Sequence, residues 1–116
     1  MSAPGLPPRM LVALAVAACA TAADAVDRET APFVIAYHCD RDGAIAVAYP
    51  AYRDAAHEPI RVSFEGRRYV MYSARSGSGA RYVTRNNRLE WWTKGDGGFL
   101  AVPGYQPPVL DNCRPI

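Results

Sequence analysis

Residues 76–82, SGSGARY, and the lysine at position 94 have the types and spacing that could do chemistry or bind a partner. Serine hydroxyls donate and accept hydrogen bonds, and glycines permit backbone with positive φ. Lys94 is the only lysine of the 116 residues, and it offers a compact ammonium group where every other base is an arginine with a planar guanidinium. On spacing alone, the stretch fits either a tight turn followed by a solvated lysine or a binding loop with a cation nearby.

Enzymatic and metal-binding arrangements find little support in the chain. His38 lies beside Cys39, His57 lies in a polar loop, and neither accompanies a nucleophile motif such as G-x-S-x-G. The two histidines and the scattered acids show no metal-ligand spacing. Residues 77–79, GSG, resemble part of a phosphate-binding loop, but no Walker lysine pattern follows. We therefore expect no enzyme activity, no cofactor and no metal.

The first 22 residues have the pattern of a secretory signal peptide. Arg9 precedes the apolar run 10–18, which is too short to span a bilayer as a helix and is followed by small residues. Residues 16–19, VAAC, resemble a bacterial lipobox, which predicts acylation (diacylglycerol and palmitate) at Cys19. Cleavage after Ala22 is the alternative. The protein is thus expected to be an outer-membrane lipoprotein facing the periplasm, anchored through Cys19, or a soluble periplasmic protein.

The cysteine count agrees with export. Cys19, Cys39 and Cys113 are an odd set, and either acylation of Cys19 or its removal with the signal leaves Cys39 and Cys113 to form a disulfide. Such bonds persist in the periplasm. Closing a loop of about 75 residues stabilises the fold by roughly 4 kcal/mol in the chain-entropy description.

Charge is distributed unevenly along the chain. Residues 24–59 contain seven acids against three arginines, whereas residues 60–94 contain eight bases against two acids. A basic region favours an acidic partner, although solvated arginines on exposed strand faces give the same composition. Nucleic acid is not an expected partner, because an exported protein does not meet it and because Trp91 and Trp92, as strand neighbours, must point to opposite faces.

Beyond a short tether at residues 23–32, the domain at 33–116 has the alternation and turn spacing of an all-β protein. About seven or eight short strands predict an antiparallel sandwich or a small barrel. The tail from Pro103, with three prolines before Cys113, is expected to be coil. The predicted strands are residues 33–39, 44–49, 60–64, 68–72, 80–84, 89–93 and 99–102.

Two motifs together resemble a known family. Residues 76–82, SGSGARY, followed by residues 91–96, WWTKGD, are similar to the MliC/PliC family of inhibitors of c-type lysozyme, and residues 37–39, YHC, with the late Cys113 match the start and the disulfide of that family. The resemblance covers roughly residues 33–113. It implies a small antiparallel β-barrel without enzymatic activity, exported and often lipid-anchored, that protects Gram-negative bacteria from lysozyme.

The resemblance also implies roles for individual residues. Residues 78–82 fit the family motif S-G-x-x-Y, so Ser78 would enter the lysozyme cleft, with Ser76 as the alternative, and Lys94 would supply the cation. Glu90 stands where the family often has a tyrosine, four residues before the lysine. The expected lysozyme-binding residues are Ser76, Ser78, Gly79, Arg81, Tyr82 and Lys94.

The sequence is therefore compatible with two functions. The first is inhibition of c-type lysozyme by insertion of the serine loop and the lysine turn into its active-site cleft. The second is a non-enzymatic envelope lipoprotein that binds peptidoglycan or another carbohydrate through exposed aromatic residues and arginines.

Overall fold

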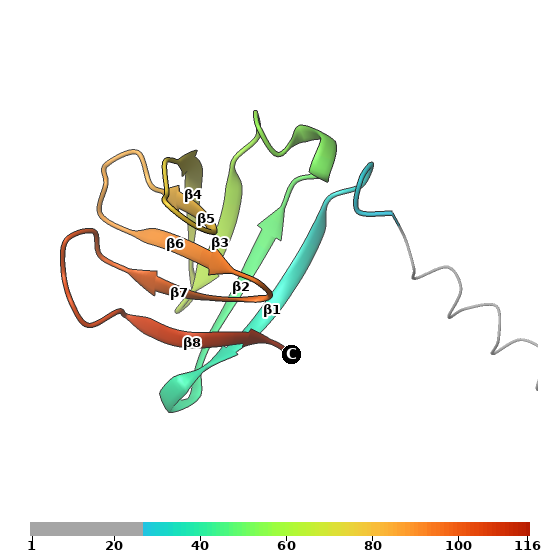
Figure 1. Ribbon diagram of the computed structural model, residues 1–116. Helices are drawn as coiled ribbons and strands as arrows, with labels where there is room; N and C mark the ends of the chain where they lie inside the picture. Colours follow the sequence, from blue (N-terminus) through green and yellow to red (C-terminus); the bar gives the residue numbers. More distant parts are fainter. Residues whose placement is uncertain (1–26) are drawn as a thin grey trace, which may run out of the picture.

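The computed structural model describes residues 27–116, which form a closed barrel of antiparallel strands in sequence order (Figure 1). This confirms the predicted all-β class, the barrel and its strand number. The predicted signal peptide, Cys19 and the first residues of the predicted tether lie outside the described residues. The elements are β1 (Phe33–Cys39), η2 (Asp40–Asp42), β2 (Gly43–Tyr49), η3 (Tyr52–Asp54), β3 (Ile60–Phe64), β4 (Arg67–Ala74), β5 (Ala80–Val83), β6 (Glu90–Lys94), β7 (Gly97–Ala101) and β8 (Leu110–Pro115).

The core follows directly from the alternation of the strands. In β3, Ile60 and Val62 point inward and are buried, whereas Arg61 and Ser63 between and beyond them are exposed. A period of two places every second side chain on one face of a sheet. Trp91 fills the centre of the barrel with no exposed surface, while its neighbour Trp92 is only partly buried on the outer face. The prediction that one tryptophan of the pair lies in the core is confirmed.

Strand β7 begins two residues earlier than the predicted strand 99–102, so it includes Gly97 and Gly98. The turn after β6 consists of Gly95 and Asp96 alone, because Lys94 pairs with Gly97 and Thr93 with Gly98. A Cβ on Gly98 would lie 2.4 Å from the Trp92 carbonyl oxygen and 2.8 Å from the Trp91 ring. The absence of a side chain at Gly98 therefore lets β7 pack directly against the large indole of the core.

The C-terminal tail is a strand, so the expectation of coil was wrong. After the proline-containing loop 102–109, β8 pairs with β7 on one side and with β1 on the other, and this closes the barrel. Its register shifts along β7, and Asn112 has φ of 52°, so two polar residues separate the buried Leu110 from the buried Cys113. This bulge breaks the period of two on which the strand prediction depended.

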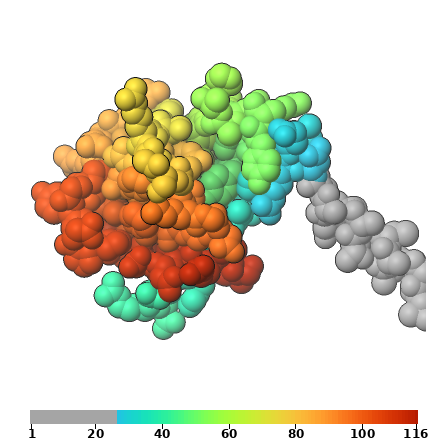
Figure 2. Space-filling view, in the orientation of Figure 1, coloured from blue at the N-terminus to red at the C-terminus, as the bar shows by residue number. Residues whose placement is uncertain are grey.

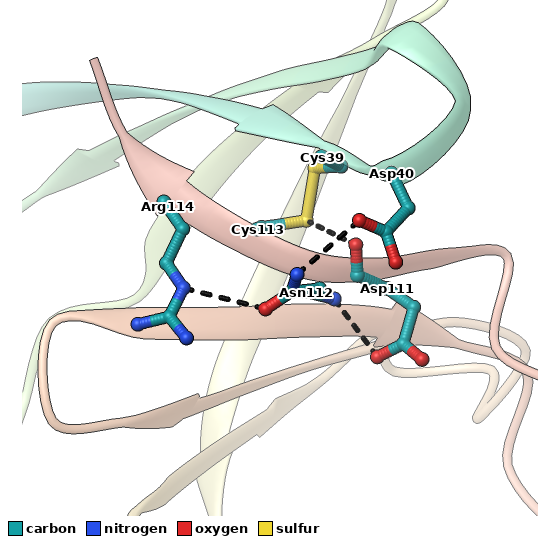
Figure 3. The surroundings of a disulfide bond; sticks show 6 residues. All are labelled: Cys39, Asp40, Asp111, Asn112, Cys113 and Arg114. Carbon is teal, nitrogen blue, oxygen red and sulfur yellow. Dashed lines mark hydrogen bonds between the residues drawn. A yellow bond between two sulfur atoms is a disulfide. The ribbon is translucent and has the colours of Figure 1, made fainter.

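The predicted disulfide between Cys39 and Cys113 is present, and it joins β1 to β8 (Figure 3). Both cysteines are buried in the core. On the surface above the bond, the Asn112 side-chain amide donates to an Asp40 carboxylate oxygen at 3.2 Å, and Arg114 Nε donates to Asn112 Oδ1 at 3.3 Å. The seam between the first and last strands is thus held by a covalent bond inside and polar bonds outside.

The antiparallel order places alternate connections at the same end of the barrel. We call one end the loop end: it carries the loop 50–59, the loop 75–79 and the turn 95–96, and the described chain enters there. Backbone bonds from Tyr52 and Arg53 to the carbonyls of Arg28 and Glu29 hold the entering segment against the loop 50–59. No helix among residues 27–116 is long and apolar enough to cross a membrane.

Reducing the disulfide should destabilise the barrel more than removing a surface contact would. The two cysteines are 74 residues apart in the sequence, so the bond restricts most of the unfolded domain. We expect reduction to lower the free energy of unfolding by about 4 kcal/mol at most. Urea denaturation with and without reductant measures the loss, and the double variant Cys39→Ser/Cys113→Ser serves as its control. Equal stability of oxidised and reduced protein would contradict the prediction.

Candidate functional site

The structure brings the serine loop (residues 75–79) and the lysine turn (residues 94–96) together at the loop end. Gly79 has φ of +70°, and a Cβ built on it would lie 2.0 Å from the Thr93 carbonyl oxygen and 3.0 Å from Lys94 Cγ. Because only glycine tolerates both the backbone conformation and the close approach, Gly79 permits the loop to rest on the end of β6. Figure 2 shows the yellow β4–β5 loop lying against the orange β6–β7 hairpin on the barrel surface.

The two serines of the loop are placed differently. Ser76 Oγ donates to the Gly79 carbonyl oxygen at 2.9 Å, which closes the loop on itself, and Ser76 is partly buried. Ser78 is exposed, and its hydroxyl makes no hydrogen bond within the described part of the chain. Ser76 therefore shapes the loop, and Ser78 presents its hydroxyl to solvent.

Lys94, the last residue of β6, is exposed and forms no ion pair with another residue of the 27–116 range. The nearest acid along the chain, Asp96, faces Arg114 instead, with Asp96 Oδ1 at 3.8 Å from Arg114 Nη1. The ammonium group thus stands at the edge of the barrel next to the serine loop, free to pair with an external carboxylate.

Arg81 is held by an internal partner rather than displayed at the loop end. Its Nε donates to Glu90 Oε1 at 2.7 Å, and its guanidinium carbon lies 5.7 Å from the centre of the Trp92 ring. Glu90 is 8% exposed although it lies on the outer face of β6. A charge-assisted bond in such a partly desolvated place ties β5 to the end of β6 that is remote from Lys94. Glu90 therefore supports the site from the position where the related family often has a tyrosine.

Tyr82 belongs to a network of aromatic residues that lines the inside of the loop end. It pairs in register with Trp91 and packs edge-to-face on Tyr49, with ring centres 6.5 Å apart. Trp91 Nε1 donates to the Tyr49 hydroxyl at 3.0 Å, and the hydroxyls of Tyr37 and Tyr49 share a hydrogen bond of 2.8 Å. These bonds satisfy polar groups that would otherwise be costly to bury.

Burial shifts the titration of these hydroxyls. Desolvation raises the pKa of Tyr49 far above its ordinary value of 10.0, and the hydrogen bond with Tyr37 raises this pKa further. Desolvation also raises the pKa of Tyr37 and that of Tyr82, the latter with a smaller contribution from the charge of Tyr37. The neutral phenol is the form that fits the barrel, because an ionised oxygen would lose its hydration there.

A hollow of about 560 Å³ opens beside the lysine turn. Its walls include the aromatic rings of Tyr49, Tyr52 and Tyr82, and the backbone of the 93–96 segment borders it. Arg28, Glu58 and Asp96 add charges of both signs. Its size is in the range of ligand-binding cavities. Among residues 27–116, no group of three or more His, Cys, Asp or Glu side chains is arranged to hold a metal ion.

The sequence indicated Ser76, Ser78, Gly79 and Lys94 as one cluster, and these four residues do lie together. It did not indicate the tyrosine network beneath them. The alternation of the first two strands indicated that Tyr37 and Tyr49 point inward. It could not indicate which strand faces Trp91 across the barrel, because that depends on how the barrel closes.

The arrangement can donate a hydroxyl hydrogen bond and a positive charge side by side from a rigid edge. It defines a class of protein: a small antiparallel β-barrel, joined by one disulfide, with exposed polar loop residues at one end. Ser78 and Lys94 are exposed, and the aromatic groups behind them pack in or against the core.

Comparison with known proteins agrees with this class. A family model described as membrane-bound lysozyme-inhibitor of c-type lysozyme, MliC, matches residues 37–108, so the chain belongs to the MliC family. The match includes Ser78 and Lys94 but ends before β8 and Cys113.

A protein of Cupriavidus necator named "Membrane-bound lysozyme inhibitor of C-type lysozyme" is 34% identical over 83 residues, which are 69% of this chain and 63% of the relative. The chain thus spans less than two thirds of the length of that relative. No solved structure matches the chain significantly.

Substituting Gly79 should show how far the site depends on its contact with β6. Gly79→Ala adds a Cβ that collides with the Thr93 carbonyl and imposes a positive φ on alanine, so we expect a loss of about 1–3 kcal/mol of unfolding free energy. Gly77→Ala is the matched control, because nothing lies within 4 Å of a Cβ at that position. Urea denaturation of both variants measures the difference. Equal effects of the two substitutions would show that the contact is unimportant.

The buried tyrosines predict a loss of stability at alkaline pH. The folded barrel keeps its buried phenols neutral while the unfolded chain releases their protons above pH 10.0, so stability is complete below that pH and falls as the pH rises. The slope should be about 1.4 kcal/mol per pH unit for each such hydroxyl. Tyr49→Phe should be less stable at neutral pH, having lost two hydrogen bonds, yet show a shallower alkaline slope. Urea denaturation across this pH range tests this, and an unchanged slope would refute it.

Proposed function

We propose that the protein is a non-enzymatic inhibitor of c-type lysozyme that inserts the Ser78 loop and the Lys94 turn into the active-site cleft of the enzyme. The observation that carries the proposal is the contact of Gly79 with Thr93 and Lys94, which sets an exposed serine hydroxyl beside an exposed ammonium group. Membership of the MliC family supports the choice of partner.

The geometry of the pair suits the target. A retaining glycosidase holds two carboxyl groups about 5 Å apart, one protonated and one ionised. Ala80 pairs with Thr93 on neighbouring strands, and Ser78 and Lys94 lie within two residues of this pair, so the two side chains leave the barrel at the same edge. The serine hydroxyl would bond one carboxyl group and the ammonium group would pair with the other. A charge-assisted bond of this kind contributes about 1.5–3 kcal/mol.

The remaining predicted binding residues take supporting parts in this proposal. Ser76 and Gly79 give the loop its shape, and Arg81 and Tyr82 fix β5 to the strand and the core behind it. Because each of these residues already has an internal partner, Ser78 and Lys94 are the two that we expect to contact the lysozyme carboxyl groups.

Location in the envelope follows from the same proposal. We infer that residues 1–22 direct export, that residues 23–32 link the barrel at 33–116 to its anchor, and that acylated Cys19 holds the protein on the periplasmic side of the outer membrane. Cleavage after Ala22 would instead release it into the periplasm. In either place the protein would stand between incoming lysozyme and the cell wall.

One observation favours the second candidate function. The hollow beside the turn has aromatic walls with hydroxyl, carboxylate and guanidinium groups at its edge, a combination that suits a sugar ring. A peptidoglycan-binding module would use this hollow and would bind murein without lysozyme. The serine–lysine pair, which projects outside the hollow, is not explained by that function.

Inhibition of lysozyme is measured directly by following the lysis of cell walls by hen or human lysozyme with the exported protein in excess. We expect the parent to abolish lysis. Ser78→Ala and Lys94→Met should each raise the inhibition constant by roughly tenfold to a hundredfold, as expected for losing one charge-assisted or cleft hydrogen bond. Their unfolding free energies should not change, since both side chains are exposed.

Ser76→Ala is the matched control for the inserted serine. It should alter loop stability more than the inhibition constant, because its hydroxyl is bonded to Gly79. Undiminished lysis with the parent protein would overturn the proposal, and binding of murein in the same preparation would favour the carbohydrate function. Inhibition that survives both Ser78→Ala and Lys94→Met would leave lysozyme as partner but would refute the site.

A further inference from the structure

Several arginines of the basic half of the sequence lie on the outer wall of the barrel, away from Arg75 and Lys94 at the loop end. Arg61 and Arg68 point outward from β3 and β4, where Arg61 pairs with Val70 and Arg68 with Ser63. The guanidinium of Arg85 lies 4.6 Å from the centre of the Tyr72 ring. We call this surface the arginine wall: Arg61, Arg68, Val70, Tyr72 and Arg85.

The charge of the arginine wall is only partly offset within residues 27–116, where Asp54 and Glu58 border one hollow with Arg61. Its three arginines take part in no ion pair in that range, and all are exposed. Glu90, one of the two acids between residues 60 and 94, is already bonded to Arg81, and the other, Glu65, lies in the β3–β4 turn. The guanidinium groups are therefore available to an external anion.

The centre of the arginine wall is apolar. Val70 is 39% exposed on the outer face of β4, and arginines lie across from it and beside it. Tyr72 follows two positions later on the same face, with its ring under Arg85. Guanidinium groups around an exposed valine and an aromatic ring match a partner whose surface carries phosphate groups above a hydrocarbon layer.

We propose that the arginine wall docks on a bilayer containing anionic phospholipids, with the arginines binding headgroup phosphates and Val70 and Tyr72 entering the interface. Arginine pairs with phosphate in two parallel hydrogen bonds, and amphipathic rings settle at the headgroup level. A soluble acidic protein or polyanion would use the charge but would leave the exposed valine without a role. The proposal does not depend on lysozyme as partner or on acylation of Cys19.

The position of the wall is compatible with activity at the loop end. The wall lies on the side of the barrel, along β3 and β4, whereas Ser78 and Lys94 lie at the end where those strands meet the loop 75–79. Docking by the side would keep the loop end clear of the bilayer. An exported protein carrying such a wall would be held at the membrane by its folded domain in addition to any lipid anchor.

The experiment measures flotation of the exported protein, with Cys19→Ser to remove acylation, on vesicles of phosphatidylcholine with and without phosphatidylglycerol. We expect binding only to vesicles with phosphatidylglycerol, weakening as salt is raised. The triple variant Arg61→Gln/Arg68→Gln/Arg85→Gln should lower the partition coefficient on the order of 100-fold. Val70→Ser should lower it about fourfold for each methylene group kept in water.

The matched control removes the same charge elsewhere: Arg41→Gln/Arg53→Gln/Arg114→Gln, all exposed and outside the wall. It should retain most of the binding. Three results would overturn the proposal: equal binding to neutral vesicles, equal loss in the control and the wall variant, or binding to heparin without binding to phosphatidylglycerol vesicles. The last result would identify a soluble polyanion as the partner. Unfolding free energies of all variants confirm that each remains folded.

Discussion

The pairing of β1 with β8 is the constraint on which the rest of the structure depends. Only Tyr37 and His38 pair in register with β8, so the seam has little backbone bonding of its own, and the disulfide between Cys39 and Cys113 makes it permanent. Closure brings Tyr37 of β1 against Trp91 of β6, and the Tyr49 hydroxyl, from the strand paired with β1, bonds to both. An open sheet would leave these hydroxyls and the Trp91 ring in water, and the platform below the serine loop would be lost.

The site depends on a series of contacts that runs from the core of the barrel to its surface. The tyrosines hold Trp91 in the core, and the inward position of Trp91 determines which side chains of β6 point outward. The end of β6 then places the Thr93 carbonyl and Lys94 beside the serine loop. On the outer face, the Arg81–Glu90 bond joins β5 to β6 toward the other end of these strands, where Glu90 pairs with Val83. Ser78 and Lys94 consequently project from a braced edge, and a braced edge loses less conformational entropy on binding than two free loops would.

Charge is divided between two surfaces of the barrel. The loop end carries acids and bases in similar number, among them Glu58, Asp96 and Lys94, which suits a cationic protein partner better than a uniformly basic surface would. Arg61 and Arg68, from the basic half of the sequence, lie on the side wall instead, whereas Arg75 lies in the loop 75–79. A local excess of positive charge in the sequence therefore did not mark the place of the serine–lysine site, and we assign it a separate partner.

The sequence by itself determined the strands, the disulfide and the motif. Alternation identified β1 to β7 because burial on one face enforces a period of two, and cysteine parity left Cys39 and Cys113 as the pair. It could not identify β8, where a bulge interrupts that period, or Glu90 as the partner of Arg81. Only the tertiary structure decided that Ser76 is bonded while Ser78 is exposed, and that Gly79 rests on Thr93. The reason is physical: periodicity records burial residue by residue, whereas these contacts depend on register between strands that closure alone sets.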